Sequence, residues 1–207
     1  MSQQEQDPKR AILQTARELF IEKGFSGTKT TEIAKRAGIN HAMLHYYYAT
    51  KQNLFNIVYK ESVNSIASSF LVLADEETSF TDMIVQTVER HFDFVKENYK
   101  IVMFVLNEMD NHPENITVWE EMAKPIFSKI MMKLNERMQR EINAGNIRNI
   151  DPLNFIVTAI SMNIFVFEAK PLLKIIRNFT PKEFNEFIEN RKKESVRLVL
   201  LSLKPEN

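Results

Sequence analysis

The sequence predicts an all-α protein of about nine helices. Its 207 residues include only four glycines and seven prolines, whereas leucine, isoleucine, lysine, glutamate, methionine and phenylalanine are abundant. This composition favours helices over strands and long loops. Asp-Pro pairs at residues 7–8 and 151–152 and a Thr-Pro pair at 180–181 place a side-chain acceptor before a proline, which is typical of helix starts. We expect a three-helix N-terminal domain at residues 6–55 and a second helical domain at residues 56–207.

The first helix is expected to run from Pro8 to Gly24. Asp7 supplies the cap, and Ile12 and Ala16 begin an apolar stripe that recurs at helical spacing. Gly24 is expected to end this helix, because glycine adopts the positive φ of a helix C-terminus without steric cost.

Two short helices follow, the first at about residues 31–37. Gly38 ends it, and Asn40 caps the next helix only two positions later. This short joint makes the two helices cross steeply, and the small side chain of Ala34 lets them approach closely. A helix-turn-helix of this kind, at about residues 29–48, places its second helix in the major groove of DNA. An ordinary helical corner is the alternative, but the combined caps, small residues and apolar positions favour the DNA-binding unit.

The segment from Arg10 to about Val58 contains the patterns Ala-x-x-Leu-Phe-x-x-x-Gly-Phe, Ile-Ala-x-x-Ala-Gly-Ile-Asn and Leu-His-Tyr-Tyr-Tyr-x-x-Lys. This segment resembles the DNA-binding part of the TetR family of one-component bacterial regulators. The resemblance implies an all-α fold, a third helix that contacts bases, a two-fold dimer and a small effector bound in the second domain. It covers the remainder of the chain only in the order and length of the helices.

The resemblance also implies roles for individual residues. Lys51 stands where the family places a phosphate-binding lysine, and Tyr47 stands where an aromatic residue or histidine contacts phosphate. Three positions depart from the family pattern, since Ala42 replaces a common glycine, His45 a common tyrosine and Tyr48 a common phenylalanine. These departures concern the operator sequence and leave the expected mode of binding unchanged.

Residues of the third helix and of the helix starts are the candidates for DNA contact. Free amides at helix N-termini, with nearby hydroxyl and ammonium groups, can bind phosphates and set the register of the protein. Histidine, methionine and tyrosine side chains on the third helix can contact base edges. We expect Tyr48 to point inward, Tyr46 toward DNA and Tyr47 between the two. The expected DNA-contacting residues are Thr28, Thr30, Thr31, Asn40, His41, Ala42, Met43, His45, Tyr46, Tyr47 and Lys51.

His45 suggests a pH-dependent contact. Because imidazole side chains commonly titrate at about pH 6.5, we expect operator affinity to depend on pH through this residue. Operator binding by the parent and a His45→Gln variant at about pH 6 and about pH 8 tests this hypothesis, and identical slopes would reject it.

Charge is unevenly distributed along a chain that carries no net charge. Residues 1–55 contain eight Lys or Arg and five Asp or Glu, a balance of +3, which leaves −3 for the remaining residues. A modestly basic segment suits a protein that approaches double-stranded DNA at one end. A nonspecific architectural DNA-binding protein would need more positive charge.

Several classes of protein are disfavoured by what the sequence lacks. It has no cysteine, its N-terminus is too polar for a secretory signal, and its longest uncharged run, Pro152–Phe167, is too short to span a bilayer. We therefore expect a cytoplasmic protein with no cofactor and no membrane association. No serine-centred elbow, phosphate-binding loop or paired-histidine motif occurs, so we expect no enzymatic activity.

Six further helices complete the predicted fold. They are expected at residues 51–73, 80–98, 99–111 and 118–144 and from residues 152 and 181 onward, with a break at 76–78 and a kink near Pro125.

The last two helices carry broad apolar faces. Such faces must be buried in the core of the chain or against a partner. The resemblance implies that they pair with their copies in a homodimer, and two-fold symmetry also suits a palindromic operator. The expected interface residues are Phe155, Ile156, Ala159, Ile160, Phe167, Val196, Val199, Leu200 and Leu203.

Large, soft side chains are frequent in the second domain. Linings rich in methionine and aromatic residues suit pockets for apolar molecules, although each such residue alone is more commonly part of a core. The expected effector-binding residues are Phe92, Met103, Phe104, Trp119, Met122, Phe127, Met131, Met162 and Phe165.

Glu108, Asp110 and His112 are the candidate metal ligands. Glu108 and His112 share a helical face, as two ligands could, but an acidic helix end before a proline is far more common, so we expect no metal site. His91, which has acidic neighbours, is expected on a solvated face.

Together these features predict a sequence-specific transcriptional regulator that binds a palindromic operator as a homodimer. We expect a repressor that a small, mostly apolar effector releases from DNA. The alternative is a helical ligand- or metal-binding protein whose DNA-binding segment serves activation or nonspecific binding.

Overall fold

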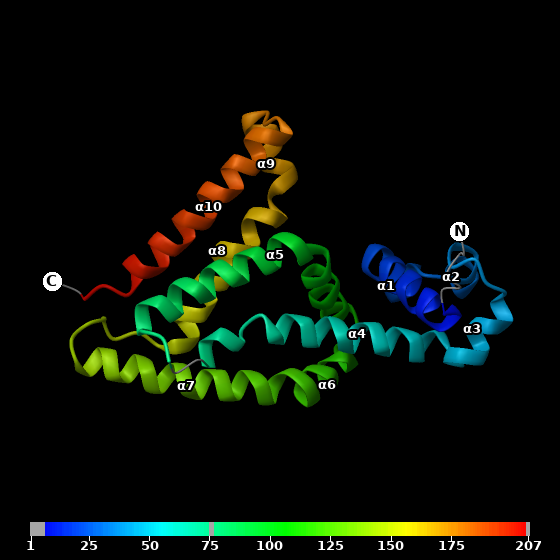
Figure 1. Cartoon of the computed structure of the whole chain (residues 1–207), viewed down its shortest axis with the longest axis horizontal. Helices are drawn as coiled ribbons and strands as arrows, with labels where there is room; N and C mark the ends of the chain where they lie inside the picture. Colours follow the sequence, from blue (N-terminus) through cyan, green and yellow to red (C-terminus); the bar gives the residue numbers. More distant parts are fainter. Residues whose placement is uncertain (1–6, 75–76, 206–207) are drawn as a thin grey trace, which may run out of the picture. The chain divides into compact units, whose positions relative to one another are not determined.

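The computed structural model describes residues 7–74 and 77–205, and all regular elements in these ranges are helical (Figure 1). The α-helices are α1 (Pro8–Gly27), α2 (Thr30–Arg36), α3 (His41–Tyr48), α4 (Lys51–Ser68), α5 (Phe80–Asn111), α6 (Ile116–Val118), α7 (Lys124–Asn143), α8 (Pro152–Glu168), α9 (Lys170–Arg177) and α10 (Pro181–Ser202). Because α6 has only three residues, nine of the described helices exceed one turn. The predicted all-α fold class is confirmed.

The chain folds into two compact units. Unit 1 comprises Met1–Ile66 and Lys100–Ala123, and unit 2 comprises Ala67–Tyr99 and Lys124–Asn207. The expected boundary between residues 55 and 56 lies inside α4. The last part of α5 belongs to the same compact unit as the helix-turn-helix segment.

Aromatic rings from three helices form the centre of unit 1. The ring of Phe55 in α4 lies 5.3 Å from that of Phe20 in α1, 4.9 Å from that of Phe25 and 6.0 Å from that of Phe104 in α5, measured between centroids. All three pairs meet edge to face, an arrangement that aromatic quadrupoles favour. The end of α5 therefore completes the aromatic core of unit 1.

The helix starts that the Asp-Pro and Thr-Pro pairs predict are confirmed. The Asp7 carboxylate accepts a hydrogen bond from the backbone N–H two residues later at 3.0 Å, and the Asp151 carboxylate accepts one from the N–H three residues later at 2.9 Å. Thr180 and Glu183 form a capping box in which each side chain accepts from the other's backbone N–H.

α5 is one helix of 32 residues where two helices were predicted. Asn98 departs from helical geometry, with φ −119° and ψ 20°, and its side-chain amide donates to the Phe94 carbonyl at 3.0 Å. The predicted junction thus coincides with a local irregularity, and the helix continues beyond it.

α4 ends earlier than predicted. It stops at Ser68, and Leu71–Ala74 forms a 3-10 helix that packs against α7. Of the predicted break at residues 76–78, Glu76 lies outside the described residues, and the next helix begins at Phe80.

The predicted long helix at residues 118–144 is interrupted just before Pro125. A 3-10 turn at Pro113–Asn115 leads into α6, a π-helical turn spans Trp119–Ala123, and α7 follows. Pro125 has no N–H to donate to the carbonyl four residues earlier, so the regular α-helical hydrogen bonds cannot pass through this position. The expected kink is therefore a change in helix type.

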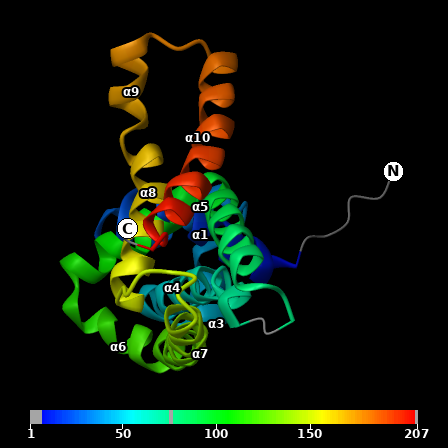
Figure 2. The same cartoon turned by 90° about the vertical axis from the view of Figure 1, so that its left-hand side faces the viewer.

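The core of unit 2 joins α5, α8 and α10, and α8 and α10 pack against each other (Figure 2). The buried residues of this cluster are Phe92, Val95, Val166, Phe167, Phe184 and Ile188. Two ion pairs also connect α5 to α10, with N–O distances of 2.6 Å between Lys96 and Glu189 and between Lys192 and Asp93.

α9 was not predicted as a separate helix. It follows α8 after Ala169, has Pro171 in its first turn and ends at Asn178, whose φ of 46° is left-handed. No single described helix is long and apolar enough to cross a membrane; α8 and α9 meet that criterion only as a pair, and they are bent by 63°.

Candidate nucleic-acid interface and buried cavity

The helix-turn-helix is built by local contacts at its turn. Gly38 adopts a φ of 69°, and the backbone N–H of Ile39 donates to the Ala34 carbonyl at 3.0 Å. The Asn40 side chain then accepts from the N–H of Ala42 at 3.0 Å, which caps α3 as predicted. The positive φ of Gly38 and the side-chain cap of Asn40 each depend on the residue type at that position.

α3 has one buried face and one exposed face. Leu44 is fully buried, and Tyr48 is 6% exposed and donates its hydroxyl hydrogen to the Lys9 carbonyl at 2.8 Å. Tyr46 is 83% exposed, and Tyr47 is half-buried. The expected inward and outward placement of these tyrosines is confirmed, and Tyr46 stands where it can meet a ligand.

Two histidines lie together on α3. Their ring centroids are 4.7 Å apart, and His41 Nε2 lies 3.0 Å from the Thr30 hydroxyl of α2. His45 Nδ1 lies 3.0 Å from the Ala49 carbonyl. Because a carbonyl only accepts, this Nδ1 carries hydrogen, and the exposed ring presents Nε2 as an acceptor when the ring is neutral.

Thr28 cannot contribute to DNA contact as expected. It is 1% exposed, and its hydroxyl is shared between the carbonyls of Leu19 and Gly24, at 3.1 and 2.8 Å. The N-cap residue of α2 is Lys29, and no side chain accepts a hydrogen bond there. Sequence spacing alone could not reveal that this hydroxyl closes the end of α1.

The start of α4 presents Lys51. The Thr50 hydroxyl accepts from the backbone N–H of Asn53 at 3.1 Å and caps the helix. The Lys51 ammonium lies 4.2 Å from the centroid of the Phe25 ring, and partial burial lowers the pKa of this lysine. The ring therefore holds a half-buried cation beside the N-terminus of the helix.

The three candidate metal ligands do not assemble. Glu108 is buried, and its Oε2 lies 3.8 Å from His112 Nε2, whereas Asp110 is exposed. In the part of the chain that the structure describes, no three histidine or acidic side chains are placed to hold a metal ion.

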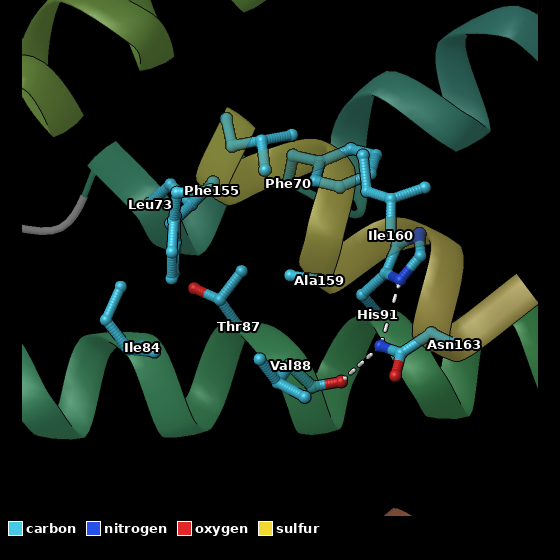
Figure 3. A pocket seen from close by; sticks show the side chains of 11 residues that line it. Phe70, Leu73, Ile84, Thr87, Val88, His91, Phe155, Ala159, Ile160 and Asn163 are labelled. Carbon is cyan, nitrogen blue, oxygen red and sulfur yellow. Dashed lines mark hydrogen bonds between the residues drawn. The ribbon is translucent and has the colours of Figure 1, made fainter. Parts of the chain in front are cut away.

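Unit 2 contains a small cavity between α5, α8 and the segment after α4 (Figure 3). Its lining residues are Phe70, Leu73, Ile84, Thr87, Val88, His91, Phe155, Ile156, Ala159, Ile160 and Asn163. The space open to the centre of a water molecule is about 20 Å³, room for one or two waters. Among the described residues, no lysine, arginine, aspartate or glutamate lines this cavity.

A histidine–asparagine pair lies at one side of the cavity. The side-chain amide of Asn163 donates to the Val88 carbonyl at 3.0 Å and lies 3.1 Å from His91 Nδ1 (Figure 3). Since this amide nitrogen is a donor, His91 accepts through Nδ1. The expectation of a solvated His91 is wrong: it is 5% exposed, and burial lowers its pKa to about 4.

The expected effector-binding residues do not line this cavity. Phe92 belongs to the core of unit 2, Phe104 belongs to the core of unit 1, and Phe165 is 68% exposed. The Phe127 ring lies 5.4 Å from the ring of the lining residue Phe70 but does not itself line the cavity. The remaining residues of the set are half-buried and also lie outside the lining; they are Met103, Trp119, Met122, Met131 and Met162. Residue type therefore predicted apolar character but not position.

Several expected dimer-interface residues are also placed differently. Phe155, Phe167, Val199 and Leu203 are buried within the single chain, and Phe155 lines the cavity together with Ile156, Ala159 and Ile160. Val196 and Leu200 are half-buried. The large apolar side chains that α8 and α10 expose were not among those expected; they are Leu153, Val157, Phe165 and Leu201.

Comparison with known proteins agrees with the helix-turn-helix geometry. Residues 12–58 match the model of bacterial regulatory proteins, tetR family. The biofilm operon icaADBC HTH-type negative transcriptional regulator IcaR of Staphylococcus aureus (strain Newman) is 27% identical over 134 residues, covering 65% of this chain and 67% of IcaR. The transposon Tn10 TetC protein of Escherichia coli is 21% identical over 142 residues, 69% of either chain.

A solved structure extends the similarity to almost the whole chain. A bacterial regulatory protein in the tetR family from Rhodococcus RHA1 has a TM-score of 0.70 at 17% identity, covering 98% of this chain and 100% of that protein. At this identity the likeness shows the fold, while the family match covers the DNA-binding helices. The chain therefore contains, at residues 12–58, the DNA-binding segment of the tetR family of bacterial regulatory proteins, and almost its whole length has the fold of a solved member of that family.

Proposed function

We propose that the protein is a dimeric repressor that binds a palindromic operator through α3 and leaves it when a small effector binds in unit 2. The observation that carries DNA binding is the division of α3 into two faces. Buried Leu44 and Tyr48 anchor the helix, and exposed His45 and Tyr46 project from it beyond the Asn40 cap.

The residues around this face divide into two sets. His41, Ala42, Met43, His45 and Tyr46 belong to α3 and are proposed to contact base edges, which carry the sequence information. Thr30, Thr31, Asn40 and Lys51 lie at helix starts, and Tyr47 lies in the last turn of α3; these residues are proposed to contact phosphates, which set the register.

A homodimer is proposed from the exposed apolar residues of unit 2. Leu153 and Val157 lie four residues apart on α8 and are 59% and 56% exposed, and Phe165 is 68% exposed. An eight-residue recognition helix contacts few base pairs, so two copies related by a two-fold axis are needed to bind a palindromic site.

The cavity of unit 2 is the proposed effector site. An effector larger than one or two waters must separate α5 from α8, and this displacement supplies the difference between two states that allosteric coupling requires. With no charged side chain among the described lining residues and a neutral His91, an ionic ligand would be buried without a partner. We therefore propose a small, neutral, mostly apolar effector.

The sign of regulation is proposed from similarity. IcaR is named as a negative regulator, and we propose repression for this chain also. The proposed activity is binding and not catalysis, and its location is the cytoplasm, where the DNA of bacteria lies.

Selection of random duplex DNA by the purified protein tests the central proposal. We expect a palindromic consensus, bound by two protein chains per duplex. Folded protein that enriches no sequence would contradict sequence-specific binding, and a non-palindromic consensus would contradict the dimeric mode.

A cavity-filling variant tests the effector site. Ala159 lines the cavity, so Ala159→Val, which adds two methyl groups to a space of one or two waters, should weaken effector-induced release from the selected operator and leave operator affinity without effector unchanged. Met103→Leu, outside the lining, is the control and should respond normally. A normal effector response in the Ala159→Val variant would place the ligand elsewhere.

A further inference from the structure

Glu108 of α5 reaches the turn that ends α1. Its Oε1 accepts a hydrogen bond from the backbone N–H of Phe25 at 2.8 Å, across 83 positions of sequence. The residue is only 6% exposed. A buried carboxylate from a distant helix thus supplies the acceptor for the backbone N–H that directly follows the non-helical residue Gly24.

The backbone approaches this carboxylate unusually closely. Gly24 has φ 69° and ψ 179°, which interrupts α1, and a Cβ added to it would lie 2.8 Å from Glu108 Oε1. Only glycine combines this φ with this approach without displacing the carboxylate. The turn and the Glu108 side chain are therefore fitted to each other.

Phe25 connects the same turn to α4. Its ring lies 4.9 Å from the Phe55 ring, and the Lys51 ammonium lies 4.2 Å from its centroid. The N–H of Phe25 is thus bound by α5 while its ring is packed against α4. Three residues after Phe25, the buried Thr28 leads directly into α2.

The second oxygen of Glu108 has no hydrogen-bond partner among the described residues. Oε2 is buried, and His112 Nε2 lies 3.8 Å away, beyond hydrogen-bonding distance. A buried carboxylate with an unpaired oxygen is costly for stability. A contribution to stability therefore does not by itself account for a carboxylate at this position.

We propose that Glu108 is a positioning residue for DNA binding. By holding the Phe25 N–H, it sets the turn between α1 and α2 and so fixes how α2 and α3 are presented to DNA. The proposal rests on DNA binding by α3 and is independent of the dimer and of the effector.

Four variants of the full-length protein test this role. Glu108→Gln keeps an acceptor oxygen at the same reach, Glu108→Asp keeps the charge but shortens the reach, and Glu108→Ala removes both. Asp110→Ala, an exposed acid two residues away on α5, is the control for loss of negative charge. Affinity for the selected operator is measured together with the thermal unfolding temperature and the hydrogen exchange of the Phe25 amide.

The positioning role and a simple charge effect predict opposite results. If Glu108 acts only through its negative charge, its loss should strengthen DNA binding equally in Glu108→Gln and Glu108→Ala. Positioning predicts about tenfold weaker binding for Glu108→Ala and Glu108→Asp, from the loss of one buried hydrogen bond, and a change below about threefold for Glu108→Gln. Asp110→Ala should bind like the parent or slightly more tightly.

Two results would overturn the proposal: operator affinity in Glu108→Asp equal to that of the parent, or a loss in Glu108→Gln as large as in Glu108→Ala. The Asp and Gln variants keep the test decisive if the Ala variant does not fold. The Phe25 amide, measured without DNA, should exchange faster in Glu108→Asp but not in Glu108→Gln. Failure of the parent to bind any duplex would instead contradict the proposed function. The exchange measurement needs no DNA, and unchanged exchange of the Phe25 amide in Glu108→Asp would reject the role of the hydrogen bond.

Discussion

Gly24 and Gly145 both have a positive φ, in different surroundings. Their φ angles are 69° and 74°, so a side chain at either position is strained. A Cβ at position 145 meets nothing within 4 Å, whereas one at position 24 meets Glu108 Oε1 at 2.8 Å. A pair of alanine variants can therefore compare a positive φ in open space with a positive φ combined with close approach to a carboxylate.

Gly145→Ala should lower the free energy of unfolding by about 1–2 kcal/mol, the usual cost of a left-handed non-glycine residue. Gly24→Ala should cost at least about 1 kcal/mol more, because the displaced carboxylate loses the Phe25 N–H as well. Urea unfolding of both variants measures the difference. Equal losses would show that the carboxylate can move aside freely.

His91 predicts a pH-dependent stability of unit 2. Its folded-state pKa of about 4 lies below the value of about 6.5 expected in the unfolded chain. Above about pH 6.5 the His91 imidazole is neutral in both the folded and the unfolded state. As the pH falls from there toward about 4, the imidazole takes up a proton in the unfolded state alone, so the free energy of unfolding decreases. A change from about pH 7.5 to about pH 5 should therefore lower the free energy of unfolding by about 1–2 kcal/mol through His91.

The measurement compares the free energy of unfolding of the parent and a His91→Gln variant at several pH values. The variant should lack the additional loss between about pH 6.5 and about pH 5, while loss from other groups remains in both. Parallel curves for the two proteins would contradict neutral burial of His91.

At the scale of the helix, the N-terminus of α4 makes a prediction about salt. Lys51 at this end is proposed to contact phosphate, and Lys60, exposed on the same helix, is not. Lys51→Ala should reduce the slope of log affinity against log salt by about one, because one fewer phosphate is neutralised by the protein. Lys60→Ala should leave the slope unchanged. Equal slopes for the Lys51 variant and the parent would remove this lysine from the interface.

Helix starts and turns were predictable because their signals are local. The Asn40 cap acts two residues along the chain and the Thr180 capping box acts over three, so both can be recognised without knowledge of the fold. The helix-turn-helix and the exposed face of α3 follow from the same short-range chemistry. Thr28 is the exception, because its hydroxyl bonds to the Leu19 carbonyl nine residues earlier.

The faces of α8 were not predictable in the same way. Phe155 and Phe165 are chemically identical and ten residues apart, yet one lines a cavity and the other is 68% exposed. α8 is apolar on most of its circumference, so its periodicity does not say which side meets α5. That choice depends on contacts between residues far apart in sequence, such as the Asn163 amide with the Val88 carbonyl.

For the whole molecule, the exposed apolar side chains of α8 predict a protein interface. Val157 is 56% exposed and lies on the same helix as Leu153 and Phe165, which are also exposed. Met132 on α7 is 55% exposed and is not part of the proposed interface. Replacement of Val157 or of Met132 by glutamate introduces the same charge at two similarly exposed apolar positions.

Val157→Glu should convert the proposed dimer into monomers, because two carboxylates related by the two-fold axis would be buried close together. Its affinity for a palindromic operator should fall by at least about tenfold, since the second recognition helix is no longer tethered to the first. Met132→Glu should remain dimeric and bind normally. Sedimentation velocity measures the assembly and operator titration the affinity. A dimeric Val157→Glu protein would exclude this face of α8 from the interface. A parent protein that is monomeric in solution yet binds a palindrome would show that the two copies meet only on DNA.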